Sequence, residues 1–144
     1  MDECVFDASF VRLANDSLFG EKLGNLLNRR LNAMRTVVDG DCRIRCNSKL
    51  LTEYSAQVRD HRNDVIEQFF SLLDSQETVW VKRSTLSRQD KNKANKCRWP
   101  THDQHVLAAA IGGNAVVIHV TEDALGLCAT SVRRIFGFHI NHVA

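Results

Sequence analysis

Residues 101–123 read THDQHVLAAAIGGNAVVIHVTED and predict a helix, a turn and a buried strand in succession. The tetrad 101–104 matches the S/T-x-x-E/Q capping box that starts many helices. Apolar residues then recur at helical spacing, at Val106, Leu107, Ala110 and Ile111. Gly112-Gly113-Asn114 ends this helix, and the apolar run 115–120 is typical of a strand covered on both faces. This order of elements predicts one unit of an α/β fold.

Strand and helix patterns alternate through the rest of the chain as well. Strands are expected at 4–6, 43–46, 78–81, 115–120 and 136–143. Helices are expected around 10–14 and over 18–38, 47–58, 65–73, 101–111 and 121–126. Alternation of this kind predicts an α/β fold, a three-layer α/β/α sandwich with a central, mainly parallel sheet. No repeat and no linker divides the sequence, so residues 1–144 are expected to form a single domain.

Length and composition fit an ordinary globular protein. The 144 residues are 44% hydrophobic and 25% charged, which excludes disordered, collagen-like and low-complexity classes. No apolar stretch approaches the ~20 residues that cross a bilayer, and the opening Met1-Asp2-Glu3-Cys4 has no signal-peptide pattern. The five cysteines form neither an even set nor a C-x-x-C pair, as expected of reduced core thiols. We therefore expect a cytoplasmic protein without a membrane span.

Positive charge is concentrated in one segment, which lies between Trp80 and Trp99. Residues 82–98 carry a net charge of +6, against −4 for the rest of the chain. The cations are Lys82, Arg83, Arg88, Lys91, Lys93, Lys96 and Arg98. The segment lacks helical periodicity and predicts an exposed basic loop that binds a polyanion such as a nucleic acid. A solvated loop that binds no ligand would show the same charge pattern. Trp80 and Trp99 could either stack on unpaired bases or anchor the loop in the core.

Four carboxylates are predicted to meet at one edge of the sheet. Asp7 follows the first strand, Asp123 follows the strand at 115–120, and Asp103 begins the helix that leads into that strand. In an open parallel sheet, the carboxyl ends of the strands and the loops that follow them share one edge. Glu53 borders the apolar face of its helix, within reach of the same edge. Carboxylates without nitrogen or sulfur ligands select hard divalent cations such as Mg²⁺ or Mn²⁺.

Each of these acids, taken alone, also fits a structural role. Asp7 is placed to cap the following helix, Asp103 and Asp123 to interact with helix dipoles, and Glu53 to lie solvated on the surface. Together they are harder to explain in this way, because carboxylates gathered at one edge repel one another unless a cation or protons compensate. Glu122 beside Asp123 leaves open which of the two faces a metal.

The histidines differ in their sequence context. His105 and His119 lie within an apolar helix and an apolar strand, so we expect them to be structural. His102, beside Asp103, is the one placed to assist proton transfer near neutral pH.

Four short motifs resemble those of the PIN-domain nucleases. They are Val5-Phe6-Asp7-Ala8-Ser9, Leu50-Leu51-Thr52-Glu53-Tyr54, DQHVLAAA at 103–110 and Val120-Thr121-Glu122-Asp123. The last two are the more specific, because D-x-x-h-L-A-A-A (h apolar), a glycine turn, an apolar strand and T-x-D follow one another within 21 residues. The resemblance implies a PIN-like α/β/α domain.

The same resemblance implies metal-dependent cleavage of RNA. The metal-binding and catalytic acids of the family fall on Asp7, Glu53, Asp103 and Asp123, and supporting polar positions fall on Ser9 and Thr121. The implied cofactor is Mg²⁺ or Mn²⁺, and the implied substrate is RNA. PIN-domain nucleases are commonly toxins of toxin–antitoxin modules, which implies an antitoxin protein as partner, and they often form homodimers.

Two functions from different classes remain open on the sequence. In the first, the chain is a metal-dependent endoribonuclease of the toxin kind. In the second, it is a catalytically inactive PIN-like module that binds nucleic acid or protein through the basic loop at 82–98. Cleavage of single-stranded RNA that a chelator abolishes distinguishes the first from the second.

Overall fold

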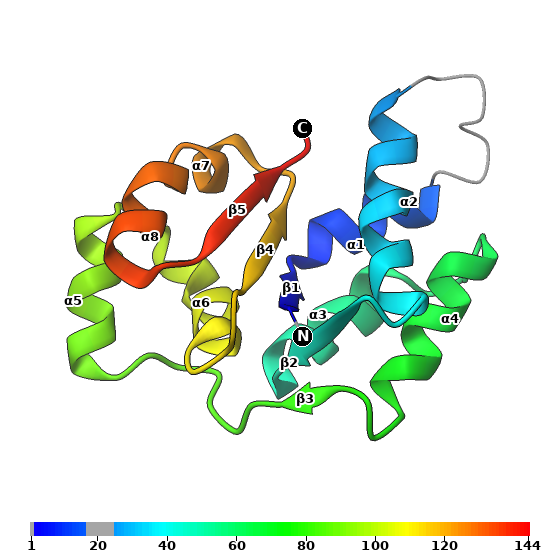
Figure 1. Cartoon of the computed structure of the whole chain (residues 1–144), viewed down its shortest axis with the longest axis horizontal. Coiled ribbons are helices and arrows are strands. Elements are labelled where there is room, and N and C mark those ends of the chain that lie inside the picture. Colours follow the sequence, from blue (N-terminus) through cyan, green and yellow to red (C-terminus); the bar gives the residue numbers. More distant parts are fainter. Residues whose placement is uncertain (1, 17–24) are drawn as a thin grey trace.

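In residues 2–16 and 25–144, which the computed structural model describes, five parallel strands form the centre of the molecule (Figure 1). The strands are β1 (Asp2–Phe6), β2 (Cys42–Cys46), β3 (Val79–Trp80), β4 (Val117–Val120) and β5 (His139–His142). They pair in the order β3-β2-β1-β4-β5, and each of these pairings is parallel. The predicted α/β class with a parallel sheet is confirmed.

Helices cover both faces of this sheet. They are α1 (Ala8–Asn15), α2 (Asn25–Val38), α3 (Ser48–Gln57), α4 (Asp64–Leu73), α5 (Arg88–Lys96), α6 (Gln104–Ala110), α7 (Asp123–Gly126) and α8 (Ala129–Phe136), with a 3₁₀ turn, η2, at Thr101–Asp103. On one face α1 packs against α2, α3 and α4, and on the other α6 lies on β1 and β2, with α5 and α8 packed together (Figure 1). None of the helices in the described ranges is long and apolar enough to cross a membrane. The arrangement is the predicted three-layer sandwich.

The central strand β1 is covered from both sides. Cys4, Val5 and Phe6 are all fully buried, so side chains on both faces of the strand contact other elements. The Phe6 ring centroid lies 5.6 Å from that of Phe10 in α1 and 5.5 Å from that of Phe69 in α4. Burying one such ring contributes about 2–3 kcal/mol to folding. An unbroken apolar run is the pattern of a strand covered in this way, which is why 4–6 was predicted correctly.

The turn after β2 follows the sequence prediction. Asn47 is buried, and its Oδ1 accepts a hydrogen bond from the backbone N–H of Leu50 (3.0 Å), which caps α3. Its Nδ2 donates to the backbone carbonyl of His105 in α6 (3.0 Å). One side chain therefore starts α3 and connects it to α6, which fixes the helix that carries Glu53.

The basic segment is helical over much of its length, so the prediction of a loop at 82–98 is wrong there. α5 begins after Ser87, whose Oγ accepts a hydrogen bond from the backbone N–H of Asp90 (3.2 Å). Ala94 is its one buried residue, and Cys97 beyond the helix is also buried. Because so few positions of α5 are apolar, its sequence shows no helical periodicity of apolar residues. The helix is stabilised instead by its N-cap and by packing against α8.

The helix prediction is wrong in two places. Thr101 does not cap a helix, because Pro100 precedes the 3₁₀ turn η2 and α6 begins only at Gln104. Phe136 ends α8, a helix absent from the sequence prediction, and Gly137 with φ 82° stops it before β5. Of the helix expected over 18–38, residues 25–38 are helical, and 18–24 lie outside the described residues.

Candidate metal and catalytic site

The chain order of the strands reverses between β1 and β4. From β1 the chain passes outward to β2 and β3, and it then returns to β4 on the other side of β1 and continues to β5. Where loops leave neighbouring strands in opposite directions, a crevice opens at the carboxyl edge, and ligands of open α/β sheets bind there. Phe6 pairs with His119, so Asp7 and Thr121 follow β1 and β4 at nearly the same level.

Asp7 is the first buried acid of this crevice. Its Oδ2 accepts a hydrogen bond from Ser9 Oγ (2.8 Å), and Ser9 Oγ lies 2.7 Å from Thr121 Oγ1. Burial raises the pKa of Asp7, the Ser9 hydrogen bond opposes this, and the charge of Glu122 raises the pKa further. The Asp7 side chain makes no capping hydrogen bond to α1. Asp7 still occupies the N-cap position of α1, where the backbone N–H of Ala8 lowers its pKa, and Ser9 and Thr121 lie beside this acid.

Asp103 is the second buried acid, at the end of η2. Its backbone carbonyl accepts a hydrogen bond from Trp99 Nε1 (2.7 Å), which fixes the main chain at this point. Burial raises the pKa of Asp103 to about 6, with a further increase from Asp7, while His102 lowers it. Its Oδ2 is buried and accepts no hydrogen bond from the described residues, although His102 Nε2 lies 3.2 Å away. A buried carboxylate oxygen in this state lacks the hydrogen bonds that normally compensate for burial.

Glu53 reaches the same crevice from α3. Its Oε1 contacts Nε2 of His105, whose side chain is buried in α6. The charge of Glu53 raises the pKa of both Asp7 and Asp103. The structure therefore brings together three of the four acids that the sequence analysis identified.

The fourth of those acids, Asp123, lies outside this group. Its side chain is 86% exposed, and its Oδ1 lies 3.2 Å from Nε2 of His142 on β5. The preceding residue, Glu122, instead raises the pKa of both buried aspartates. Ligand atoms of Glu122, His102 and Asp103 lie within 4.8 Å of one another. We call the group Asp7, Glu53, Asp103 and Glu122 the acidic cluster.

Glu122 and His105 are the residues at this site that the sequence did not assign. Neighbouring side chains in a turn point in different directions, and the sequence does not reveal which of the two exposed acids Glu122 and Asp123 lies beside Asp103. His105 has its acidic partner 52 positions earlier in the chain, so no local pattern connects the two. The other core histidine, His119, is structural as expected: it stacks on Phe6 at 4.5 Å, and burial lowers its pKa to about 4.

The donor set of the acidic cluster fits a hard divalent cation. Carboxylate oxygens are the ligands that Mg²⁺ and Mn²⁺ prefer. The largest influences on the pKa values of Asp7 and Asp103 include acidic neighbours and no lysine or arginine. Oδ2 of Asp103 is buried and accepts no hydrogen bond from the described residues, and the group that faces it at 3.2 Å is Nε2 of the exposed His102. The ligand atoms of His102, Asp103 and Glu122 lie close enough together to hold such a cation, and Asp7 and Glu53 add negative charge beside them.

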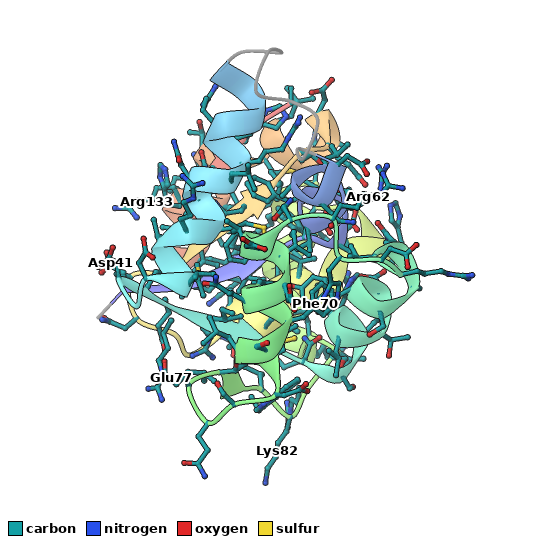
Figure 2. All side chains as sticks on the ribbon, turned by 90° about the vertical axis from the view of Figure 1, so that its right-hand side faces the viewer. Asp41, Arg62, Phe70, Glu77, Lys82 and Arg133 are labelled. Atoms are coloured by element: carbon teal, nitrogen blue, oxygen red, sulfur yellow. The ribbon has the colours of Figure 1, made fainter. Side chains whose placement is uncertain are left out.

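The cations of the segment 82–98 form a basic surface. Six of them are exposed: Lys82, Arg83, Arg88, Lys91, Lys96 and Arg98. The seventh, Lys93, is partly buried, with Nζ 5.9 Å from the ring centroid of Phe136. None of the seven takes part in an ion pair within the described parts of the chain. Figure 2 shows Lys82 extending outward from the body of the molecule.

The two tryptophans beside the basic surface differ in burial. Trp99 is buried and holds the backbone of Asp103, so the anchoring role fits it, whereas Trp80 at the end of β3 is 47% exposed. The backbone N–H of Trp99 donates to the carbonyl of Ala94 (3.0 Å) and closes the end of α5. Arg98, within this turn, has φ 60°, the left-handed conformation in which glycine is usual.

No protein-family model, no curated protein and no solved structure matches this chain. Function is therefore inferred from the acidic cluster, the basic surface and the motif resemblance.

Proposed function

We propose that this chain is a PIN-domain endoribonuclease that hydrolyses RNA phosphodiester bonds with Mg²⁺ or Mn²⁺ as cofactor. The observation that carries the proposal is the buried Oδ2 of Asp103, which accepts no hydrogen bond from the described residues and lies near three other carboxylates. Acids that serve a fold normally have partners that offset their charge, whereas burial and acidic neighbours raise the pKa of Asp7 and of Asp103, and the ion-pair partner of Asp103 is the exposed His102. The four motifs that resemble PIN-domain nucleases supply the reaction class.

The chain's own residues hold the carboxylates in fixed orientations. Ser9 fixes Oδ2 of Asp7 through its hydroxyl, and Trp99 fixes the main chain of Asp103. Ordering these groups before substrate arrives lowers the entropy loss on binding. A divalent cation, when bound, supplies positive charge that offsets the charge of a phosphodiester and lowers the pKa of water. His102, exposed with Nε2 3.2 Å from Asp103 Oδ2, is placed to exchange a proton with solvent.

Attack by water in line with the leaving oxygen gives a 5′-phosphate and a 3′-hydroxyl and does not require the ribose 2′-hydroxyl. The choice of RNA rests on the motif resemblance, and the exposed cations of the basic surface support binding to a polyanionic backbone.

The resemblance also supports a cytoplasmic toxin of a toxin–antitoxin module, in which an antitoxin protein covers the acidic cluster. It further supports a homodimer as the assembly.

The test is cleavage of end-labelled single-stranded RNA by purified protein, with Mn²⁺ and with EDTA. We expect cleavage that EDTA abolishes, and a loss of about a thousandfold in Asp7→Asn and Asp103→Asn, typical for removal of groups that stabilise a transition state. Asp41→Asn, which changes an exposed acid directly before the start of β2 (labelled in Figure 2), at the opposite edge of the sheet from the cluster, is the matched control and should cleave like the wild type. Undiminished cleavage by both cluster variants would refute the assignment.

A second candidate function is supported by the basic surface alone. Its six exposed, unpaired cations suit a module that binds nucleic acid without cutting it. In that case RNA should bind with strong salt dependence, and the labelled RNA should stay intact in Mn²⁺.

A further inference from the structure

We infer that His105 is a positioning residue, which orients Glu53 and thereby sets the affinity of the acidic cluster for a divalent cation. This inference rests on the proposed function, because it assigns a role within the same site. It departs from the expectation that His105 is purely structural.

The contacts of the His105 ring are few and specific. The side chain is 1% exposed, and its Nε2 contacts Oε1 of Glu53. The other ring nitrogen, Nδ1, is buried and has no hydrogen-bond partner in the described structure. Because Nε2 faces a carboxylate, which can only accept when ionised, Nε2 is the nitrogen that donates a proton to this contact. The polar interaction of this ring is therefore with Glu53.

The backbone around His105 is also fixed. Its carbonyl accepts a hydrogen bond from Asn47 Nδ2 (3.0 Å), and the same asparagine caps α3 through Leu50. The helix that carries Glu53 and the helix that carries His105 are thus joined at their first turns. Because both ends of the Glu53–His105 contact lie on connected helices, the contact can determine where the carboxylate points.

Glu53 needs such a partner more than the two aspartates do. Its side chain is 33% exposed, and it lies near the charges of Asp7 and Asp103. Repulsion and hydration both favour a rotamer that turns the carboxylate outward to water. A donor held rigidly on the inner side opposes that turn and keeps one oxygen toward His105.

A purely structural explanation accounts poorly for a histidine at this position. The neighbours Val106 and Leu107 are fully buried, and a leucine in this position would leave no polar atom without a partner. The chain instead keeps a ring whose Nδ1 is unsatisfied, and its compensation is the bond to Glu53. Groups that hold a metal-binding carboxylate in this way typically change metal affinity 10–100-fold when they are removed.

The experiment measures Mn²⁺ binding by metal-free protein, from the electron paramagnetic resonance signal of free Mn²⁺. We expect His105→Leu to weaken binding about 10-fold or more. His105→Gln should recover most of the affinity, because a glutamine amide can present an N–H near the position of Nε2. The matched control is His119→Leu, which also replaces a buried core histidine but one that contacts Asn141 and no carboxylate, and it should bind Mn²⁺ like the wild type.

A double-mutant cycle separates positioning from general damage to the fold. In the Glu53→Ala background, His105→Leu and His105→Gln should cause little further loss of Mn²⁺ affinity, because the residue through which His105 acts is gone. An equal loss in both backgrounds, or unchanged binding by His105→Leu, would overturn this inference and leave the nuclease proposal standing. Absence of Mn²⁺ binding by the wild type would overturn both. The His105→Gln comparison is decisive even if His105→Leu does not fold.

Discussion

The two edges of the sheet bury charge in different ways. Near the amino edge, where α6 ends, the buried guanidinium of Arg45 pairs with Glu3 (3.2 Å). It also donates to the backbone carbonyls of Ala109 (2.7 Å) and Ile111 (2.8 Å). At the carboxyl edge, the buried carboxylate of Asp103 accepts no hydrogen bond at Oδ2 from the described residues, and burial together with acidic neighbours raises its pKa.

This difference separates charge that supports the fold from charge that is available to a ligand. Arg45 neutralises an acid and binds carbonyls at the negative end of α6, so the chain itself satisfies its donors. The acidic cluster gathers like charges, and this arrangement lowers the stability of the folded state. Proteins keep such arrangements where function requires them.

The largest expected effect on stability comes from removing Arg45, whose contacts compensate the buried charge at the amino edge. Arg45→Met removes the buried cation that pairs with Glu3 and leaves two helix carbonyls without their donor, so the free energy of unfolding should fall by about 3–5 kcal/mol. Urea denaturation measures this loss. Arg62→Met is the matched control, because the Arg62–Asp16 pair (3.0 Å) is exposed, and it should change stability by less than about 0.5 kcal/mol. Similar effects of the two variants would contradict the distinction between the edges.

An intermediate effect on stability is expected from neutralising Asp103 at the carboxyl edge. The pKa of Asp103 rises from 3.8 to about 6 on folding, so between these pH values the folded chain binds more protons than the unfolded chain. The free energy of unfolding therefore falls as pH rises from about 4 to about 6, and Asp103→Asn removes this part of the fall. In EDTA, the variant should match the wild type near pH 4 and exceed it by about 1–2 kcal/mol above pH 6.

Urea denaturation at a series of pH values tests this prediction. Saturating Mn²⁺ at pH 7.5 should reduce the advantage of the variant, because the wild type gains stability by binding the cation. A difference between the two proteins that does not change with pH would contradict the assigned pKa.

The smallest effect concerns the strained residues at each edge. Arg98 and Ala115 both have positive φ, 60° and 46°, so replacing either by glycine should stabilise the fold by about 1 kcal/mol. Arg98→Gly also removes a cation from the basic surface and should weaken RNA binding a few-fold. Ala115→Gly should leave RNA binding unchanged. Thermal unfolding and fluorescence anisotropy with labelled RNA in EDTA give the two readouts, and equal RNA affinity of both variants would remove Arg98 from the interface.

The five strands and the place of Asp7 on the sheet followed from the sequence because they depend on local patterns. The apolar run 4–6 predicted β1, and the position of Asp7 at the crevice follows directly from where that strand ends. α5 was not predicted because a helix that buries little beyond Ala94 has no apolar stripe to detect. Charge alone still identified its basic surface, since exposure of lysines and arginines does not depend on the backbone conformation.

Contacts between distant side chains were beyond local patterns. The direction of the turn before α7 determines whether Glu122 or Asp123 lies beside Asp103. The contact of Asp123 with His142 on the neighbouring strand β5 also contributes. The contact of His105 with Glu53 depends on how α3 and α6 meet. Such contacts are set by tertiary packing, and a single sequence contains no direct record of them.

The Ser9–Thr121 contact has a consequence for the timing of synthesis. These hydroxyls are 112 positions apart, and β1 pairs with β4 only after β2, β3 and the intervening helices have been made. At translation rates of about 5–20 residues per second, the emerging polypeptide spends several seconds without its second half. Asp7 therefore meets Glu122 only after the segment that contains β4 has left the ribosome, and under the proposed function a shorter nascent chain lacks the complete acidic cluster.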